Sequence, residues 1–374
     1  MKKNIYKPNY DRSILSISSS IMKYYGMNLN YKSLGELDNL LEKKYKNVIF
    51  LILDCLGTKV LTDNLKDDSL LRTNLITNVT SVFPPTTAAA TTAFHSGMSP
   101  LENGWIGWMP YFKEYNKIIE LFTGNDFYTR EKVIEPFDDK LLKYKTIYEK
   151  ISETNKNVKY HKIFPANIDA NGASSFKELC DKIKKCCNNG TTNLISAYWN
   201  EPDHTIHNNG VNNEAVKNVL NDIEINVKEL TTNLKDSIVI ISADHGAVDV
   251  EEVYINEIAD INDCLAMPPS IESRFVTFFI KKGMKNKFKK AIKEHFEDGY
   301  ILYNKEQFMQ ENLLGRGLSN QRINSYFGDY ILILYSNLNI RYSISSQKDK
   351  IHLADHGGIT KEEMMVPLIV LDCK

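Results

Sequence analysis

The stretch VIFLILD, residues 48–54, is a run of six large apolar residues that ends on an aspartate. A short run of this kind, rich in Ile and Leu, is typical of a strand that is buried on both faces of a sheet. Similar runs occur at residues 193–198, 237–242 and 366–371, and longer amphipathic stretches separate them. This alternation predicts an α/β fold built on a sheet of mostly parallel strands.

The stretches between these runs supply the helices of the predicted fold. Apolar residues at helical spacing indicate helices over residues 87–97, about 138–153, 174–187 and 212–233. From about 250 to 350 the pattern changes, because the strand-like FVTFFI and YILILYS flank a basic amphipathic stretch, KKGMKNKFKKAIKEHF. We interpret residues 1–374 as a single α/β domain that carries a cap-like insertion at about 250–350.

Composition and cysteine usage restrict the partners and the compartment. Lys plus Arg number 46 against 47 Asp plus Glu, a formal charge of -1, so no global basic field attracts nucleic-acid polymers or membranes. Six cysteines without a CxxC pair are typical of reduced thiols. The N-terminal residues lack the apolar stretch of a signal peptide, and no run of about 18 apolar residues is present to span a bilayer. We therefore expect a cytoplasmic protein.

Three fragments each pair a carboxylate with an imidazole: NEPDHTIH (200–207), SADHG (242–246) and ADHGG (354–358). Asp54 and the first two fragments follow predicted strands, whose carboxyl ends meet at one edge of an α/β sheet. The third fragment precedes the run 366–371, so it has to reach that edge from a loop. Asp203 and His207 are four residues apart, which places them on one face of a helix. A single Asp-His pair is usually a helix cap or a surface pair, but three together favour a divalent metal site.

A candidate nucleophile lies in TSVFPPTTAAATTAFHSG, residues 80–97. Pro84 and Pro85 favour an extended entry, and Thr86 or Thr87 can cap the helix that follows. A threonine at this place is ordinarily only a cap. Beside metal ions, however, the free N–H groups of a helix start can bind phosphate, and a hydroxyl on a metal ionises readily.

In their order along residues 46–371, LDCLG, PPTTAAATTAFHSG, EPDHTIH, ADHG and ADHGG resemble the alkaline phosphatase superfamily, in particular its type I phosphodiesterase and nucleotide pyrophosphatase branch. The resemblance implies a doubly wound sheet with helices on both faces and two divalent ions, usually zinc, with manganese as the alternative. It implies Thr87 as the nucleophile, because the reactive hydroxyl of the family stands ten residues before the Gly that is Gly97 here. The implied ligands are Asp203, His207 and His356 for one ion and Asp54, Asp244 and His245 for the other, and Thr87 is a further metal-binding residue.

By this resemblance we expect a metal-dependent phosphoesterase that cleaves a phosphodiester or pyrophosphate bond of a small-molecule phosphate ester through a phospho-threonine intermediate. The alternatives in the superfamily are a phosphomonoesterase, a phosphonate or sulfate ester hydrolase, and a cofactor-independent phosphomutase. Sulfatases use a modified Cys or Ser and the mutases use a Ser, so Thr87 argues against both. A non-catalytic metal-binding module is the alternative outside enzymes, and the complete ligand set argues against it.

Some positions depart from the pattern of the resembled branch. Cys55 stands where the family usually has Gly. Trp108 stands at about the position of an Asn in the phosphate pocket of nucleotide pyrophosphatases, so we take Trp108 as a candidate substrate contact. Its neighbours Trp105, Tyr111 and Phe112 either line the site with it or fill the core.

Arg274 and the two histidines His204 and His352 each allow two interpretations. Arg274, in PPSIESR, either binds a substrate anion or forms an ordinary salt bridge. His204 and His352 lie near the ligand fragments, and they either face solvent or orient the ligands through hydrogen bonds.

Overall fold

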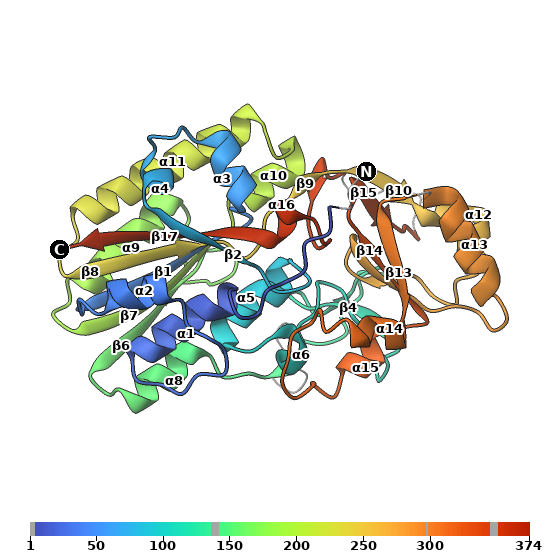
Figure 1. Cartoon of the computed structure of the whole chain (residues 1–374), viewed down its shortest axis with the longest axis horizontal. Coiled ribbons are helices and arrows are strands. Elements are labelled where there is room, and N and C mark those ends of the chain that lie inside the picture. Colours follow the sequence, from blue (N-terminus) through green and yellow to red (C-terminus); the bar gives the residue numbers. More distant parts are fainter. Residues whose placement is uncertain (1–3, 136–141, 297, 345–350) are drawn as a thin grey trace.

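The computed structural model describes residues 4–135, 142–296, 298–344 and 351–374. Its centre is a six-stranded sheet in the order β2-β17-β8-β1-β7-β6 (Figure 1). Strands β1, β6, β7 and β8 are parallel to one another, and β17 is antiparallel to both of its neighbours. The predicted α/β fold on a mostly parallel sheet is confirmed. The strands are β1 Asn47–Leu53, β2 Leu75–Thr80, β6 Val158–Ile163, β7 Thr192–Trp199, β8 Ser237–Ser242 and β17 Met365–Cys373.

Helices cover both faces of this sheet, so its central strands are buried along their whole length. Every residue of β1 and β8 is buried. The double winding that the family resemblance implied is confirmed (Figure 1). One face carries α1 Ile14–Tyr24, α2 Gly35–Leu41, α5 Thr87–Ser96 and α8 Ile147–Thr154, and the other carries α3 Thr58–Asn64, α4 Leu70–Thr73, α9 Phe176–Cys187, α10 Asp203–Asn209 and α11 Glu214–Thr232.

The predicted helices at 87–97, 174–187 and 212–233 agree with α5, α9 and α11 to within two residues. The helix predicted at about 138–153 is shorter, because α8 begins only after Thr146. The Thr146 side chain accepts a hydrogen bond from the Glu149 N–H and so fixes the start of the helix. Residues 138–141 of that prediction lie outside the described residues.

Between β8 and β17 the chain builds a second body with its own sheet and core (Figure 1). FVTFFI and YILILYS pair as neighbouring strands of an antiparallel sheet in the order β11-β12-β14-β13. The description of this body as a cap stays a prediction. Its strands are β9 Val248–Asp249, β10 Glu251–Tyr254, β11 Ser270–Ile271, β12 Phe275–Phe278, β13 Tyr300–Asn304, β14 Tyr330–Leu334, β15 Leu338–Arg341 and β16 Ala354–Asp355, and its helices are η1 Ile255–Glu257, α12 Ala259–Asn262, α13 Lys285–Phe296, α14 Lys305–Gln310 and α15 Ile323–Tyr326.

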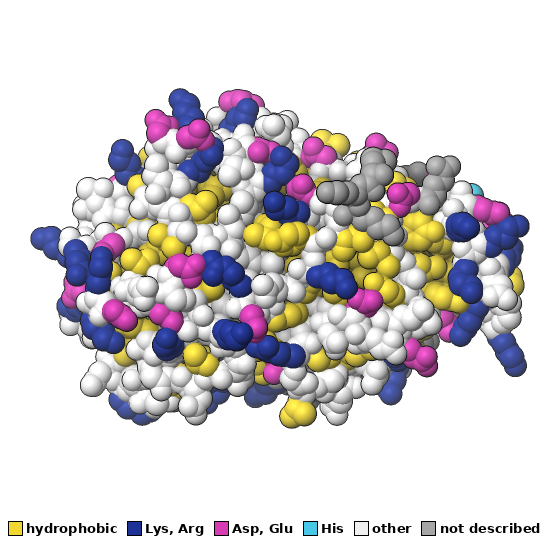
Figure 2. Space-filling view, in the orientation of Figure 1, with side chains coloured by type: hydrophobic (Ala, Val, Ile, Leu, Met, Phe, Trp, Pro, Cys, Tyr) yellow, Lys and Arg dark blue, Asp and Glu magenta, His cyan; other side chains and the backbone are white. Residues whose placement is uncertain are grey.

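The basic stretch predicted in this region forms α13. Phe288, Ile292 and Phe296 face the core, while the lysines lie on the solvent side. Figure 2 shows Lys and Arg side chains gathered at this end of the molecule, and a mixture of both signs over the rest of the visible face. Among the helices in the described parts of the chain, none combines the length and apolar character that a bilayer crossing requires.

The direction of the strands determines where the site forms. The carboxyl ends of β1, β7 and β8 meet at one edge because these strands are parallel. Since β17 is antiparallel, its first residues lie at that same edge, and the loop before α16 Lys361–Met364 and β17 reaches it. Two small elements complete the surroundings, α6 Pro100–Asn103 and the three-stranded sheet of β3 Tyr111–Phe112, β4 Lys117–Glu120 and β5 Asn125–Asp126.

Candidate active site

One group of candidate ligands forms around α10. This helix places Asp203 and His207 one turn apart, as the spacing predicted, and the His207 Nε2 atom lies 3.3 Å from Asp203 Oδ2. His356 comes from the loop before β17, and its Nε2 atom lies 3.7 Å from Asp203 Oδ1. One ligand atom from each of the three residues lies within 4.8 Å of the others. The structure therefore brings together the first predicted set.

A second group forms between the ends of β1 and β8. The His245 Nε2 atom lies 3.4 Å from Asp54 Oδ1 and 3.5 Å from Asp244 Oδ2, and all three residues are buried. Backbone groups fix the orientation of these side chains. The backbone N–H groups of Cys55 and His245 each donate to Asp244 Oδ1 at 3.0 Å, which turns Oδ2 towards the imidazole. The Tyr198 hydroxyl donates to the other oxygen of Asp54, Oδ2.

The two groups are adjacent, since the rings of His245 and His356 stack with centroids 3.8 Å apart. Cys55 lies between the groups, close to Asp203 and His245. Its φ of +63° is a left-handed conformation, which explains why glycine suits this turn. Burial, and then the nearby carboxylates, raise the pKa of the Cys55 thiol, so it remains protonated.

The donor set fits divalent cations. Oδ1 of Asp54, Oδ1 of Asp203, Oδ2 of Asp244 and Nδ1 of His356 are buried without a hydrogen-bond partner among the described residues, although buried polar atoms normally have one. Burial lowers the pKa of His356 to about 3 and that of His245 to about 4, so both imidazoles are neutral and keep a lone pair for a metal. Burial also raises the pKa of Asp244 to about 6, and a cation would offset this cost of ionisation.

Thr87 lies beside the second group. It is the first residue of α5, and its Oγ1 atom lies 3.2 Å from His245 Nε2. Thr86 occupies the N-cap position, but its side chain makes no capping bond and instead donates to Glu272 Oε1 at 2.7 Å. The sequence left open whether Thr86 or Thr87 caps the helix. In the structure Thr86 is the N-cap residue, and the two hydroxyl groups have different partners. Thr87 faces the ligand cluster at a helix start, where free backbone N–H groups favour an anion.

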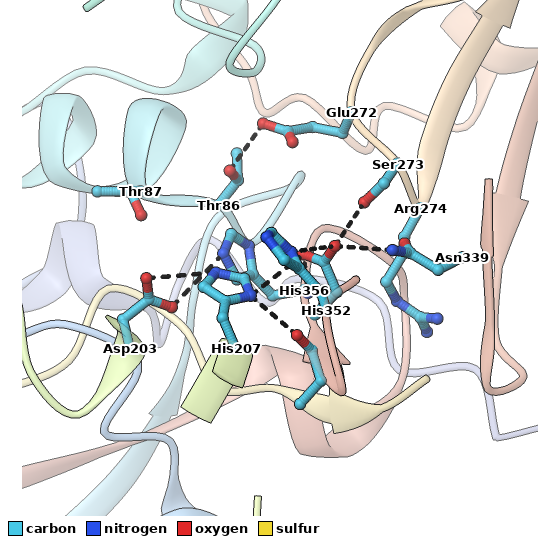
Figure 3. A network of polar contacts seen from close by, with 12 residues as sticks. Thr86, Thr87, Asp203, His207, Glu272, Ser273, Arg274, Asn339, His352 and His356 are labelled. Carbon is cyan, nitrogen blue, oxygen red and sulfur yellow. Dashed lines mark hydrogen bonds and ion pairs between the residues drawn. The ribbon is translucent and has the colours of Figure 1, made fainter. Parts of the chain in front are cut away.

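Asp355 lies beside the ligand groups, and the sequence did not single it out. Its Oδ2 atom accepts hydrogen bonds from Asn339 at 2.8 Å, Ser273 at 3.1 Å and His352 at 3.3 Å, and Figure 3 shows these three partners. The ring of His352 packs on that of His207, with centroids 4.3 Å apart. Through these hydrogen bonds Asp355 holds the side chains of Ser273, Asn339 and His352 beside the ligand groups. Asp355 belongs to the fragment ADHGG, but the family resemblance assigns a metal-binding role only to the histidine of that fragment.

A cavity of about 440 Å³ opens above the ligand groups. Trp108 lines this cavity, whereas Trp105 and Phe112 are buried in the core. The aromatic segment therefore contributes both to the cavity wall and to the core. Glu272 also lines the cavity, although no motif in the sequence marks it. The lining residues are Thr86, Thr87, Trp108, Met109, Glu120, Phe127, Arg130, Asp203, His207, Glu272, Ser273, Arg341, His352, Asp355 and His356.

Arg274 has a structural role, which resolves its two interpretations. It is completely buried, and its Nε atom lies 2.7 Å from Glu363 Oε1. Its other nitrogens donate to the backbone oxygens of Ser336 and Leu338. Arg274 is therefore occupied within the protein and does not face the cavity.

Comparison with known proteins places these features in context. A family model described as type I phosphodiesterase / nucleotide pyrophosphatase matches residues 48–358. None of the curated proteins matches the chain by sequence.

Solved structures with a similar fold come from mammals and bacteria. Murine ectonucleotide pyrophosphatase / phosphodiesterase 5 is 16% identical, with a TM-score of 0.64 over 86% of this chain and 87% of its own. An inactive threonine-to-alanine variant of that murine protein, solved in complex with AMP, has the same TM-score of 0.64 and identity of 16%, over 87% of each chain. Phosphonoacetate hydrolase from Sinorhizobium meliloti 1021, in complex with phosphonoacetate, is 14% identical, with a TM-score of 0.60 over 86% of this chain and 89% of its own. At these identities the likeness shows the shared fold.

Removal of divalent metal is expected to lower the thermal stability of the protein. Asp54, Asp203 and Asp244 lie close together, and without a cation their charges repel one another. At 100 times its dissociation constant, a bound ion should add about 2.7 kcal/mol to the free energy of unfolding. Calorimetric Tm values before chelation, after it, and after resupply of zinc or manganese measure this effect. The variant Asp244→Asn should show a smaller metal-dependent rise in Tm, and a wild-type Tm that ignores metal would contradict the site.

Proposed function

Because this chain belongs to the type I phosphodiesterase / nucleotide pyrophosphatase family, we propose that it hydrolyses a phosphodiester or pyrophosphate bond in a small-molecule substrate. The chain is accordingly a hydrolase that acts on ester bonds. The single observation that carries the specific proposal is the position of Thr87, at a helix start and 3.2 Å from a histidine of the candidate metal cluster. A hydroxyl placed in this way can act as a nucleophile on phosphorus.

We assign two ions, of zinc or alternatively manganese, to the two ligand groups. Bound there, the ions would act as Lewis acids that favour ionisation of the Thr87 hydroxyl and neutralise the phosphoryl oxygens. In the proposed first step Thr87 Oγ1 forms a bond to phosphorus while the bond from phosphorus to the leaving group breaks. In the second step a water molecule attacks the phosphorus of the phospho-threonine and releases Thr87. The inactivity of the threonine-to-alanine variant of the murine relative supports this assignment.

The walls of the cavity support a small substrate. The cavity volume of about 440 Å³ lies within the range of sites for small molecules. Trp108 provides an apolar surface near Thr87, and we propose that it contacts the leaving group. We also retain the cytoplasm as the proposed compartment, since the six cysteines are all free thiols.

The proposed activity is tested with two chromogenic esters and with phosphonoacetate, whose cleavage is followed by the release of inorganic phosphate. Metal-stripped protein is resupplied with zinc, manganese or magnesium and assayed with bis-(p-nitrophenyl) phosphate, p-nitrophenyl phosphate and phosphonoacetate. We expect the diester to be cleaved fastest, with activity dependent on the added metal. Preference for the monoester would move the assignment to a phosphatase, and preference for phosphonoacetate would move it to a phosphonate hydrolase, whose fold this chain shares.

The variant Thr87→Ala is expected to lose at least about 10³-fold in turnover, because it removes the nucleophile. Metal content, measured by elemental analysis, should stay nearly unchanged, since six other ligands remain. Thr62→Ala, at a partly exposed threonine of α3, is the matched control and should keep wild-type activity. Full activity in Thr87→Ala would reassign the nucleophile.

The variant His356→Ala is expected to lose one metal ion per chain. The substitution removes one of the three candidate ligands Asp203, His207 and His356. The other group, of Asp54, Asp244 and His245, stays intact. Elemental analysis of dialysed protein measures the ratio, and His295→Ala on the exposed face of α13 serves as a control. Retention of both ions in His356→Ala would show that this histidine is not a ligand.

A further inference from the structure

Tyr198, in strand β7, is a buried tyrosine whose hydroxyl group contacts a candidate metal ligand. The hydroxyl donates a hydrogen bond to Asp54 Oδ2. The residue is 6% exposed, and its ring packs on that of Phe164 with centroids 5.7 Å apart. In the described part of the chain, neither Tyr198 nor Asp54 is among the residues that line the cavity. The hydroxyl therefore reaches Asp54 from inside the fold, on the side away from the substrate.

The register of the sheet places this hydroxyl beside Asp54. Strands β1 and β7 are parallel, and Ile52 of β1 is paired with Tyr198 of β7. The backbone N–H of Asp54 donates to the Trp199 oxygen at 3.0 Å, so the pairing continues beyond the end of β1. Side chains two residues apart point to the same face of a sheet, which puts Asp54 on the face of Ile52 and Tyr198. A tyrosine is long enough to reach such a diagonal neighbour.

The two oxygens of Asp54 consequently have different surroundings. Oδ2 accepts the bond from Tyr198, whereas Oδ1 is buried without a partner among the described residues and lies 3.4 Å from His245 Nε2. Asp244 shows the same division, since its Oδ1 accepts two backbone N–H groups and its unpartnered Oδ2 lies 3.5 Å from the same nitrogen. The His245 Nδ1 atom lies 3.1 Å from the Gly246 carbonyl oxygen, which can only accept, so in the neutral ring Nε2 keeps the lone pair. Each candidate ligand of this group thus offers one free atom.

The two carboxylates differ in what holds them. Asp244 is held by backbone N–H groups, which a side-chain substitution leaves in place. Asp54 is held by the side chain of Tyr198. Without that hydroxyl, Oδ2 of Asp54 loses a donor in a buried place, where an unpaired oxygen is costly. A carboxylate can bind a metal ion through one oxygen or through both, so rotation of Asp54 towards the ion would recover this cost.

We propose that Tyr198 is a positioning residue for the ion that we assign to Asp54, Asp244 and His245. Its hydrogen bond confines Asp54 to coordination through Oδ1, and thereby sets both the affinity of this ion and the number of atoms that bind it. Thr87 depends on the same arrangement, because its Oγ1 atom lies 3.2 Å from His245 Nε2. Residues that hydrogen-bond a metal ligand from behind commonly orient it in this way. The inference rests on the proposed function, which places an ion in this group.

The variant Tyr198→Phe removes the hydroxyl and keeps the ring. It is made in full-length protein that also carries His356→Ala, so that only the second ligand group is complete. Zinc affinity is measured by competition with a chromogenic chelator, and the visible absorption of bound cobalt reports the coordination of the metal. Tyr326→Phe in the same background is the matched control, because Tyr326 is also buried and its hydroxyl has no partner among the described residues. The Tm of each metal-free variant reports whether the fold is intact.

We expect zinc to bind roughly 10- to 100-fold more weakly when Tyr198→Phe is added to the His356→Ala parent, the usual cost of losing a hydrogen bond behind a metal ligand. The cobalt absorption should also weaken, because a rotated Asp54 adds an oxygen ligand and a higher coordination number lowers the intensity. The control Tyr326→Phe should keep the affinity and the spectrum of the parent.

Parental zinc affinity in folded Tyr198→Phe would overturn the proposal. An unchanged cobalt spectrum would overturn it too, even with weaker binding, since Tyr198 would then act only on the stability of the fold. If Tyr198→Phe fails to fold, Asp54→Asn and Asp54→Ala decide. With Tyr198 present, the hydroxyl holds the amide oxygen and the NH₂ group, which has no lone pair for a metal, faces the ion. Zinc should therefore bind as weakly to Asp54→Asn as to Asp54→Ala, and clearly tighter binding to Asp54→Asn would contradict the proposal.

Failure of the proposed function gives a different result. Wild type that binds two ions but cleaves no ester would overturn the proposed hydrolysis alone, because the zinc affinities measure the role of Tyr198 without catalysis. Wild type that binds no divalent metal would overturn both.

Discussion

Repulsion among three neighbouring carboxylates, from Asp54, Asp203 and Asp244, is the constraint on which the rest of the site depends. Like charges in a poorly solvated place are costly unless positive charge or hydrogen-bond donors compensate them. The chain supplies part of the compensation itself. Burial opposes the charge of Asp203, but the imidazole of His207 lowers its pKa below the ordinary value, and backbone N–H groups bond Asp244. Oxygens that still lack partners leave a place for cations, and this requirement explains why the strand ends, α10 and the loop before β17 converge.

The sequence predicted those parts of the arrangement that depend on patterns between residues close together in the chain. Apolar runs that end in Asp54 or in Asp244 identify strands and the edge where they end, and the spacing of Asp203 and His207 identifies one face of a helix. The family resemblance added the roles of the individual residues. It named Thr87, and the structure shows that Thr87 and its neighbour Thr86 face different partners.

The part that the sequence did not predict depends on contacts between distant segments. Glu272 accepts a hydrogen bond from Thr86, which is 186 residues away in the chain, and neither residue type nor spacing predicts this pair. Asp355 gathers donors from the turn before β12, from β15 and from the loop that carries His352, so its role exists only after the second body has folded. The strand direction of β17 is likewise fixed by its neighbours β2 and β8, since an apolar run has the same pattern in either direction.

The buried pair of Arg274 and Glu363 joins two parts of the molecule that the chain visits about 90 residues apart. Arg274 belongs to the turn that also carries Glu272 and Ser273, and Glu363 lies in α16 and accepts the backbone N–H of Gly358, close to His356. One wall of the cavity is thus tied to the loop that carries a candidate ligand. The wall formed by Trp108 and the β3-β4-β5 sheet is joined to the same turn, because the Trp108 N–H donates to Glu272 and the backbones of Met109 and Ile271 are paired. A substitution in that wall therefore also acts on the turn that carries Glu272 and Arg274, and through Arg274 on the loop that carries His356.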